Sequence, residues 1–96
     1  MLIKDNNIFF KHKDIEFPVA YKLKVIMDAT VPDDENSANI NEVFEELSIP
    51  NSNWKSKLSK KGNYISFSIM VHVKSQEKFD ALYSKLDELE ALKWAV

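Results

Sequence analysis

The chain of 96 residues contains no cysteine, no arginine and a single glycine, Gly62. Without cysteine it has no disulfide framework, no thiolate metal site and no thiol nucleophile. One glycine cannot build a phosphate-cradling loop, because such loops need several glycines. We therefore expect neither a bound metal nor another cofactor.

The missing arginine also bears on nucleic-acid binding, since all thirteen basic residues are lysine. Lysine lacks the planar fork with which arginine holds a phosphate or a guanine edge through two hydrogen bonds. The formal net charge of −2 argues in the same direction. Low arginine can equally reflect genome base composition, so nucleic acid is disfavoured as a partner but not excluded.

Long apolar runs are absent too, since no stretch of about 18 apolar residues exists. The N-terminus is too polar for a signal peptide. We expect a cytoplasmic protein with no membrane contact. The length suits one domain, and 45% hydrophobic with 29% charged residues is ordinary for a globular chain. We expect an N-terminal extension over residues 1–14, mobile or loosely docked, and a single domain over residues 15–96.

Charge is unevenly distributed along the chain. Residues 28–46 hold seven acidic side chains and no lysine, whereas residues 51–74 hold five lysines and no acid. This pattern indicates either an acidic and a basic face or simply two solvated surfaces, and the second interpretation is favoured.

The strongest pattern is the alternation of apolar and polar residues after the basic turn Lys60–Asn63. One face of this strand collects five apolar residues: Ile65, Phe67, Ile69, Val71 and Val73. The other face collects Tyr64, Ser66, Ser68, Met70 and His72. This period of two predicts a half-buried strand with Phe67 at the centre of its core face.

Three further strands are expected. The first begins after Pro18 and places Lys22, Lys24 and Ile26 on its wetter face. After a turn at 51–53, the second covers 54–59 with Trp54, Ser56 and Leu58 on one side. Gly62 and Asn63 tolerate the positive φ of a hairpin turn. The last covers 91–96, with Leu92, Trp94 and Val96 on one side.

Two helices are expected between these strands. Residues 29–39 are predicted to form a loop, with Asn39 capping a helix that ends near Ser48, because Pro50 prevents its continuation. Ser75 is predicted to cap the second helix. The resulting order of strand, helix, strand, strand, helix, strand predicts the α+β class. It indicates a ferredoxin-like βαββαβ sandwich, with a four-stranded antiparallel sheet and both helices on one face.

Several short elements follow one another in a distinctive order: Glu16-Phe17-Pro18, the strand Tyr21 to Met27, Ser59-x-x-Gly62-x-Tyr64-x-Ser66, and the closing helix and strand. In this order they resemble the YbeD-like family of small bacterial proteins of unknown function. The resemblance covers residues 15–96 and implies a ferredoxin-like fold similar to ACT regulatory domains. It also implies regulation of metabolism, with a suggested connection to lipoate. It carries no catalytic residues, and Met27 departs from the glycine that relatives often have there.

No enzyme is expected from the residues themselves. The two histidines, His12 and His72, fall in unrelated segments without a partner at a recognisable spacing. Paired acids such as Asp33-Asp34 lack the apolar surroundings that would raise the pKa of a carboxyl group for acid–base catalysis.

We therefore expect a non-catalytic regulatory or adaptor domain that binds a protein partner or a small effector. An edge strand or the open sheet face offers a route to a homodimer. The alternative is a nucleic-acid-binding domain that uses the basic hairpin and the open face. It is weaker, because Asn63, Ile65 and Ser68 stand where an RNA recognition motif has aromatic residues. The candidate partner-binding residues are Lys55, Lys57, Lys60, Lys61, Tyr64, Met70 and His72.

Overall fold

The computed structural model describes residues 15–96, so the predicted N-terminal extension, residues 1–14, lies outside the described residues. Strands and helices follow one another in the predicted order. They are β1 (Val19–Asp28), α1 (Asp33–Leu47), β2 (Asn51–Leu58), β3 (Tyr64–Val73), α2 (Gln76–Asp87) and β4 (Leu92–Ala95).

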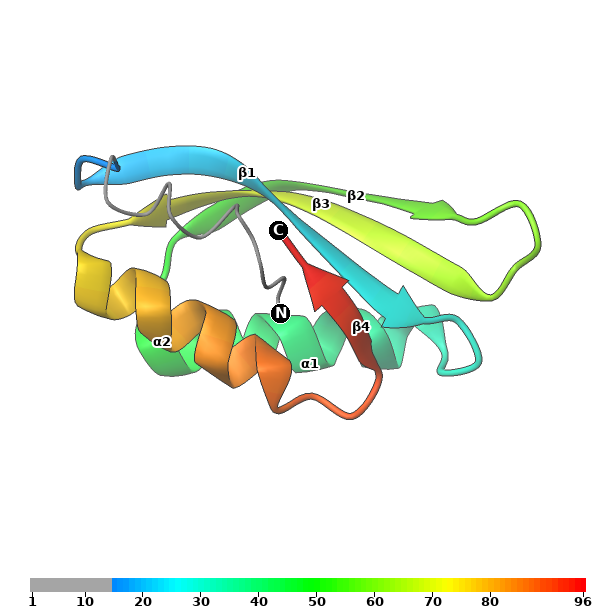
Figure 1. Ribbon diagram of the computed structural model, residues 1–96. Helices are drawn as coiled ribbons and strands as arrows, with labels where there is room; N and C mark the ends of the chain where they lie inside the picture. The colour runs from blue at the N-terminus through cyan, green and yellow to red at the C-terminus, as the bar shows by residue number, and fades with distance from the viewer. Residues whose placement is uncertain (1–14) are drawn as a thin grey trace.

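The four strands form one sheet in the order β2-β3-β1-β4, with every neighbouring pair antiparallel. The long strands β1 and β3 lie at the centre, and β2 and β4 form the edges. Both helices cover the same face of the sheet and leave the other face open (Figure 1). This arrangement confirms the predicted ferredoxin-like sandwich.

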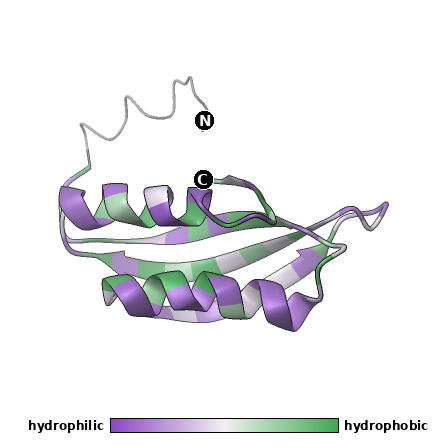
Figure 2. Cartoon of the chain, turned by 90° about the horizontal axis from the view of Figure 1, so that it is seen from below, coloured by the Kyte–Doolittle hydropathy of each residue, from purple (hydrophilic) through white to green (hydrophobic). Residues whose placement is uncertain are grey.

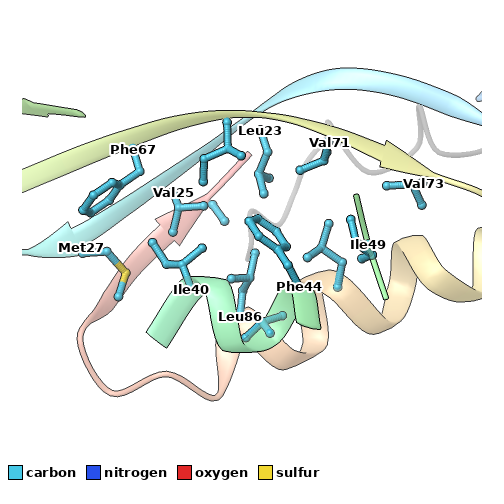
Figure 3. Close-up of a cluster of buried hydrophobic side chains, with 14 of the residues drawn as sticks. Leu23, Val25, Met27, Ile40, Phe44, Ile49, Phe67, Val71, Val73 and Leu86 are labelled. Carbon is cyan, nitrogen blue, oxygen red and sulfur yellow. The ribbon is translucent and has the colours of Figure 1, made fainter. Parts of the chain in front are cut away.

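The core lies between the sheet and the helices (Figure 3). Phe67 is 4% exposed, and the other odd-numbered residues of β3 from Ile65 to Val73 are buried with it. β1 contributes Leu23, Val25 and Met27, all 0% exposed. The alternation along β3 therefore predicts correctly which of its side chains face the helices.

The helices supply the second half of this core. Figure 2 shows hydrophilic and hydrophobic residues alternating along both helices and along the strands. In α1 the apolar residues Ile40, Val43 and Phe44 are buried, and in α2 the buried residues are Phe79, Leu82 and Leu86. Ser75 caps α2 as predicted, since its side chain accepts a hydrogen bond from the Lys78 backbone N–H at 3.2 Å.

The predicted start of α1 is wrong. The helix begins at Asp33, well before Asn39, with Pro32 as its N-cap residue. Asn36 is fully buried, and its side-chain amide donates to the carbonyl oxygens of Asp28 at 3.0 Å and Val31 at 3.3 Å. Proline and acidic residues are common both in loops and in the first turn of a helix, where acids complement the helix dipole. Composition alone therefore did not separate loop from helix. The helix ends at Leu47, as predicted.

The predicted turn at residues 51–53 is also wrong, because this segment already belongs to β2. The pairing with β3 shifts between Ser52 and Lys55, where β2 contains one extra residue, and Asn53 has a φ of 54°. An asparagine tolerates this left-handed conformation, and a bulge of one residue accommodates it without ending the strand.

β4 contains a comparable irregularity, which corrects the prediction that Leu92, Trp94 and Val96 lie on one side. Met27 pairs with Leu92, whereas the preceding Ile26 pairs with Trp94. The shift leaves Leu92 packed against the core, while Trp94 lies on the open face and is 46% exposed. A strict period of two failed here because a bulge reverses the facing of the residues beyond it.

A hydrogen bond between two tyrosine side chains connects α2 to β1. The hydroxyl oxygens of Tyr21 and Tyr83 lie 2.8 Å apart and share a hydrogen bond. Partial burial raises the pKa of Tyr83 to about 12. Burial, together with the neighbouring Tyr83, also raises the pKa of Tyr21. Both hydroxyls are therefore held protonated in the folded state.

Phe67→Ala should lower the free energy of unfolding by roughly 3–5 kcal/mol, because it removes a buried ring and leaves a cavity. Urea unfolding followed by circular dichroism measures this loss. An unchanged midpoint would contradict the place of Phe67 in the core. Ser66→Ala, on the opposite face of β3, is the matched control.

The tyrosine pair should make the domain sensitive to alkali. A tyrosine whose pKa is higher in the folded than in the unfolded state stabilises the fold below the unfolded value, near 10. This stability is lost as the pH rises toward the folded value of about 12. Between these pH values the free energy of unfolding of wild type should fall more steeply than that of Tyr21→Phe/Tyr83→Phe. Equal slopes in urea titrations of the two proteins would refute this assignment.

Candidate partner-binding face

The face of the sheet opposite the helices presents the even-numbered residues of β3 between residues of β1 and β2. Ser66 pairs with Ile26 on one side and Lys57 on the other. Ser68 lies in the same way between Lys24 and Lys55. This part of the face therefore has two serines at its centre, with Lys24 and Ile26 on the β1 side and Lys55 and Lys57 on the β2 side.

Farther along β3, the same face continues to the opposite end of the sheet. Met70 pairs with Lys22 of β1 and Ser52 of β2, and His72 pairs with Ala20. Met70 is half-buried, whereas His72 is exposed. Among the described residues, no helix or loop covers this face (Figure 1).

Two aromatic side chains meet at one end of the face. The rings of Tyr64 and Trp94 lie 6.0 Å apart between centroids and cross at 63°, an edge-to-face contact. Tyr64 is 40% exposed and Trp94 is 46% exposed, while Ile26 between their strands is only 8% exposed. The aromatic pair thus reduces the solvent exposure of Ile26, which lies on the face that the helices leave open.

These residues border a hollow of about 470 Å³, which we call the aromatic hollow. Its lining is formed mainly by Ile26, Leu58, Tyr64, Ser66 and Trp94, together with Lys57 and Lys60. A mostly apolar concavity with cationic groups beside it can accept an apolar group that carries negative charge nearby.

The predicted site residues divide into groups. Lys57, Lys60 and Tyr64 line the aromatic hollow. Lys55 lies on the same face of β2, opposite Ser68, and Lys61 is exposed in the hairpin turn. Met70 lies two residues before His72, nearer the far end of the face.

His72 lies at the far end, beside a second hollow of about 300 Å³ that also involves Pro18, Ala20 and Pro50. His72 and Tyr64 are eight positions apart along an extended strand, which corresponds to about 26 Å. The face therefore cannot bring these two side chains onto one small ligand, but one elongated partner can contact both.

Sequence reasoning did not include Trp94 and Ile26 in the candidate site. Trp94 was expected on the same side of its strand as Leu92, and the bulge in β4 separates the two. The predicted fold could have indicated this contact. In a ferredoxin-like sheet the last strand lies beside the first, which brings Trp94 near Ile26 on the open face.

Charge is segregated between the two sides of the molecule. Lys22, Lys24, Lys55 and Lys57 are exposed on the open face, and the four strands contain a single acidic residue, Asp28. Hydrogen bonds from the backbone and hydroxyl of Thr30 hold the pKa of Asp28 below its ordinary value. The exposed acids of α1 lie on the other side: Asp33, Asp34, Glu35, Glu42, Glu45 and Glu46. The open face is therefore basic, although the net charge of the chain is −2.

The described residues offer no metal centre, because nowhere in 15–96 do three His, Asp or Glu side chains come close enough to hold an ion. Neither of the two helices in this part of the chain is long and apolar enough to cross a membrane.

Comparison with known proteins places the chain in a family. The sequence profile described as "Protein of unknown function (DUF493)" matches residues 12–96. The chain belongs to this family. Among curated relatives, a UPF0250 protein of Shewanella piezotolerans is 35% identical over 79 residues, which are 82% of this chain and 86% of the relative. A UPF0250 protein of Idiomarina loihiensis is 30% identical over 82 residues, or 85% and 90% of the two chains. The YbeD-like resemblance is thereby confirmed.

Solved structures support the fold assignment for this DUF493 protein. Protein HP0495 from H. pylori superposes with a TM-score of 0.67 at 20% identity, over 97% of this chain and 89% of that one. The ACT domain of a GTP pyrophosphokinase from Chlorobium tepidum gives a TM-score of 0.63 at 11% identity, over 82% and 96%. At these identities the likeness concerns the fold alone.

The hairpin that carries Lys60 and Lys61 depends on Gly62, whose φ is +77°. The Gly62 N–H donates to the Ser59 carbonyl at 3.0 Å, and the Ser59 N–H donates to the Tyr64 carbonyl at 2.8 Å. Asn63, the second residue expected to need a positive φ, does not have one.

Gly62→Val should lower the free energy of unfolding by roughly 1–2 kcal/mol, because a β-branched residue is disfavoured at positive φ. Beyond its two chain neighbours, a Cβ atom at this position would meet nothing within 4 Å, so the cost comes from the backbone conformation and not from a clash with the rest of the domain. Gly62→Asn is the control and should cost less, since asparagine tolerates this conformation. Thermal unfolding of both variants measures the difference, and equal losses would contradict this explanation.

Proposed function

We propose that this DUF493 protein is a non-catalytic regulatory or adaptor domain that binds a partner protein or a small effector on its open sheet face. The aromatic hollow carries this proposal, because it combines a tyrosine and a tryptophan that are each close to half exposed. Exposed apolar patches often mark binding sites, and tyrosine and tryptophan are enriched among the residues that contribute most to binding.

The lysines around the hollow would steer a negatively charged partner toward it. Lys57 and Lys60 line the hollow, and Lys55 lies beside it on β2. Charges placed around an apolar contact raise the association rate and select among partners more than they add affinity. The aromatic hollow and the basic hairpin thus have complementary roles.

A regulatory role is supported by the ACT domain of the GTP pyrophosphokinase, which shares this fold. The YbeD-like resemblance adds lipoate metabolism as the pathway to test first. That connection, the cytoplasmic location and a homodimer through an edge strand or the sheet face all stay predictions. Sizing chromatography across a range of concentrations decides between monomer and dimer.

Cross-linking affinity purification from native lysate tests the protein-partner form of the proposal. Partners that cross-link to the wild type should be lost from Tyr64→Ala/Trp94→Ala, because this variant removes both walls of the hollow. Glu42→Ala, an exposed position on α1 at the helix side, is the control and should keep them. If the double variant folds and retains every partner, the open face is not the binding surface.

A thermal-shift screen with lipoic acid and other metabolites tests the effector form. A ligand that binds only the folded state raises the melting temperature, by an amount that grows with its concentration relative to Kd. The shift should disappear in Trp94→Ala. A shift that persists in this variant would place the effector elsewhere.

A further inference from the structure

We infer that the partner of the open face is an extended acidic peptide segment with one large apolar residue and carboxylates at alternate positions after it. This inference rests on the proposed function and specifies the chemistry of the partner. The apolar residue would occupy the aromatic hollow, and the carboxylates would follow β3 between the lysines of β1 and β2.

The shape of the face favours an elongated ligand. The aromatic hollow lies at one end, and the hollow beside His72 lies at the other. Between them, Ser66, Ser68 and Met70 form a row of partly buried side chains. Ser68 lies between Lys24 and Lys55, and Ser66 lies between Ile26 and Lys57. Because both serines are shorter than these neighbours, we expect a shallow track along this part of β3. A compact ligand would use only one end of this track.

The spacing of the lysines favours an extended peptide. Lys55 and Lys57 are two residues apart on β2, and Lys22 and Lys24 are two residues apart on β1. Residues that share one face of a strand repeat every two positions, about 6.6 Å apart. An extended peptide presents its alternate side chains at the same interval, so carboxylates at alternate positions would meet successive lysines.

Charge complementarity supports an acidic partner. The four exposed lysines of β1 and β2 lie on a face whose strands contain no acid except Asp28. Asp28 lies at the end of β1, where it accepts hydrogen bonds from Thr30 and lies 3.9 Å from the Lys93 ammonium group. The lysines of the track have no anionic partner within the strands, which leaves them free to pair with a bound segment.

Single-stranded nucleic acid fits this face less well. Such ligands are held by aromatic side chains that repeat along a basic track and stack on successive bases. Here both exposed aromatics lie at one end and contact each other. Beyond Tyr64, the row along β3 offers two serines, a methionine and a histidine.

A second copy of the chain also fits less well. Its acidic surface lies on α1, which could pair with the lysines. However, the large apolar residues of α1 pack toward its own core: Ile40, Val43 and Phe44 are buried, and Leu47 is packed against the same core. The acidic surface of α1 therefore presents no large, fully exposed apolar side chain to fill the aromatic hollow.

Fluorescence anisotropy with labelled synthetic probes tests the inference on the full chain. The first probe is a peptide with a leucine followed by glutamates at alternate positions separated by serines. The second has the same composition with its glutamates consecutive, and the third has lysine in place of glutamate. The fourth probe is an oligodeoxythymidine. The alternating peptide should bind most tightly, and its affinity should fall as salt is added.

Variants assign the contacts. Trp94→Ala should weaken the alternating peptide roughly tenfold or more, as expected for a large aromatic residue that anchors a bound side chain. Lys55→Gln/Lys57→Gln should weaken it and reduce its salt dependence. Gln76→Glu/Ser84→Glu has the same net charge as this lysine variant but alters exposed positions of α2, so it should bind like wild type. Circular dichroism confirms that each variant is folded.

Several results would overturn the inference. Equal binding of the two acidic peptides would show that bulk charge and not spacing is recognised. Tighter binding of the oligodeoxythymidine, with a steeper salt dependence, would assign the face to nucleic acid. A dimer that excludes the peptide would assign it to a second copy. If no probe binds while cross-linked partners still depend on Tyr64 and Trp94, the acidic-segment inference fails and the proposed function stands.

Discussion

The period of two along β3 is the constraint on which the rest of this domain depends. Because Ile65, Phe67 and Ile69 must face the helices to form the core, Ser66 and Ser68 are forced onto the opposite face. A slip of one residue would exchange the two sets and expose the core. The candidate binding face is therefore fixed by the same packing that holds the fold together.

The irregularities of the edge strands then shape that face. The bulge in β4 lets one short strand contribute Leu92 to the core and Trp94 to the open face. Without it, Trp94 could not contact Tyr64 and cover Ile26. Bulges at sheet edges commonly reorient side chains near functional sites, and here the reoriented side chain forms a wall of the aromatic hollow.

The sandwich also explains how an acidic protein can present a basic surface. The acids follow β1 in the chain and belong to α1, whereas the lysines belong to the strands. Because both helices lie on one face, this difference in sequence position becomes a difference between two sides of the molecule (Figure 1). Net charge alone would have hidden the property that most affects the choice of partner.

The sequence by itself determined the element order, the fold class, the core face of β3 and the family, because these depend on local periodicity and on short ordered motifs. It did not determine the start of α1, since Pro32 and the acids after it suit a loop and a helix equally. Only the tertiary structure joined Trp94 and Ile26 to Tyr64. Cross-strand register and bulges arise from contacts between distant segments, and no local pattern encodes them.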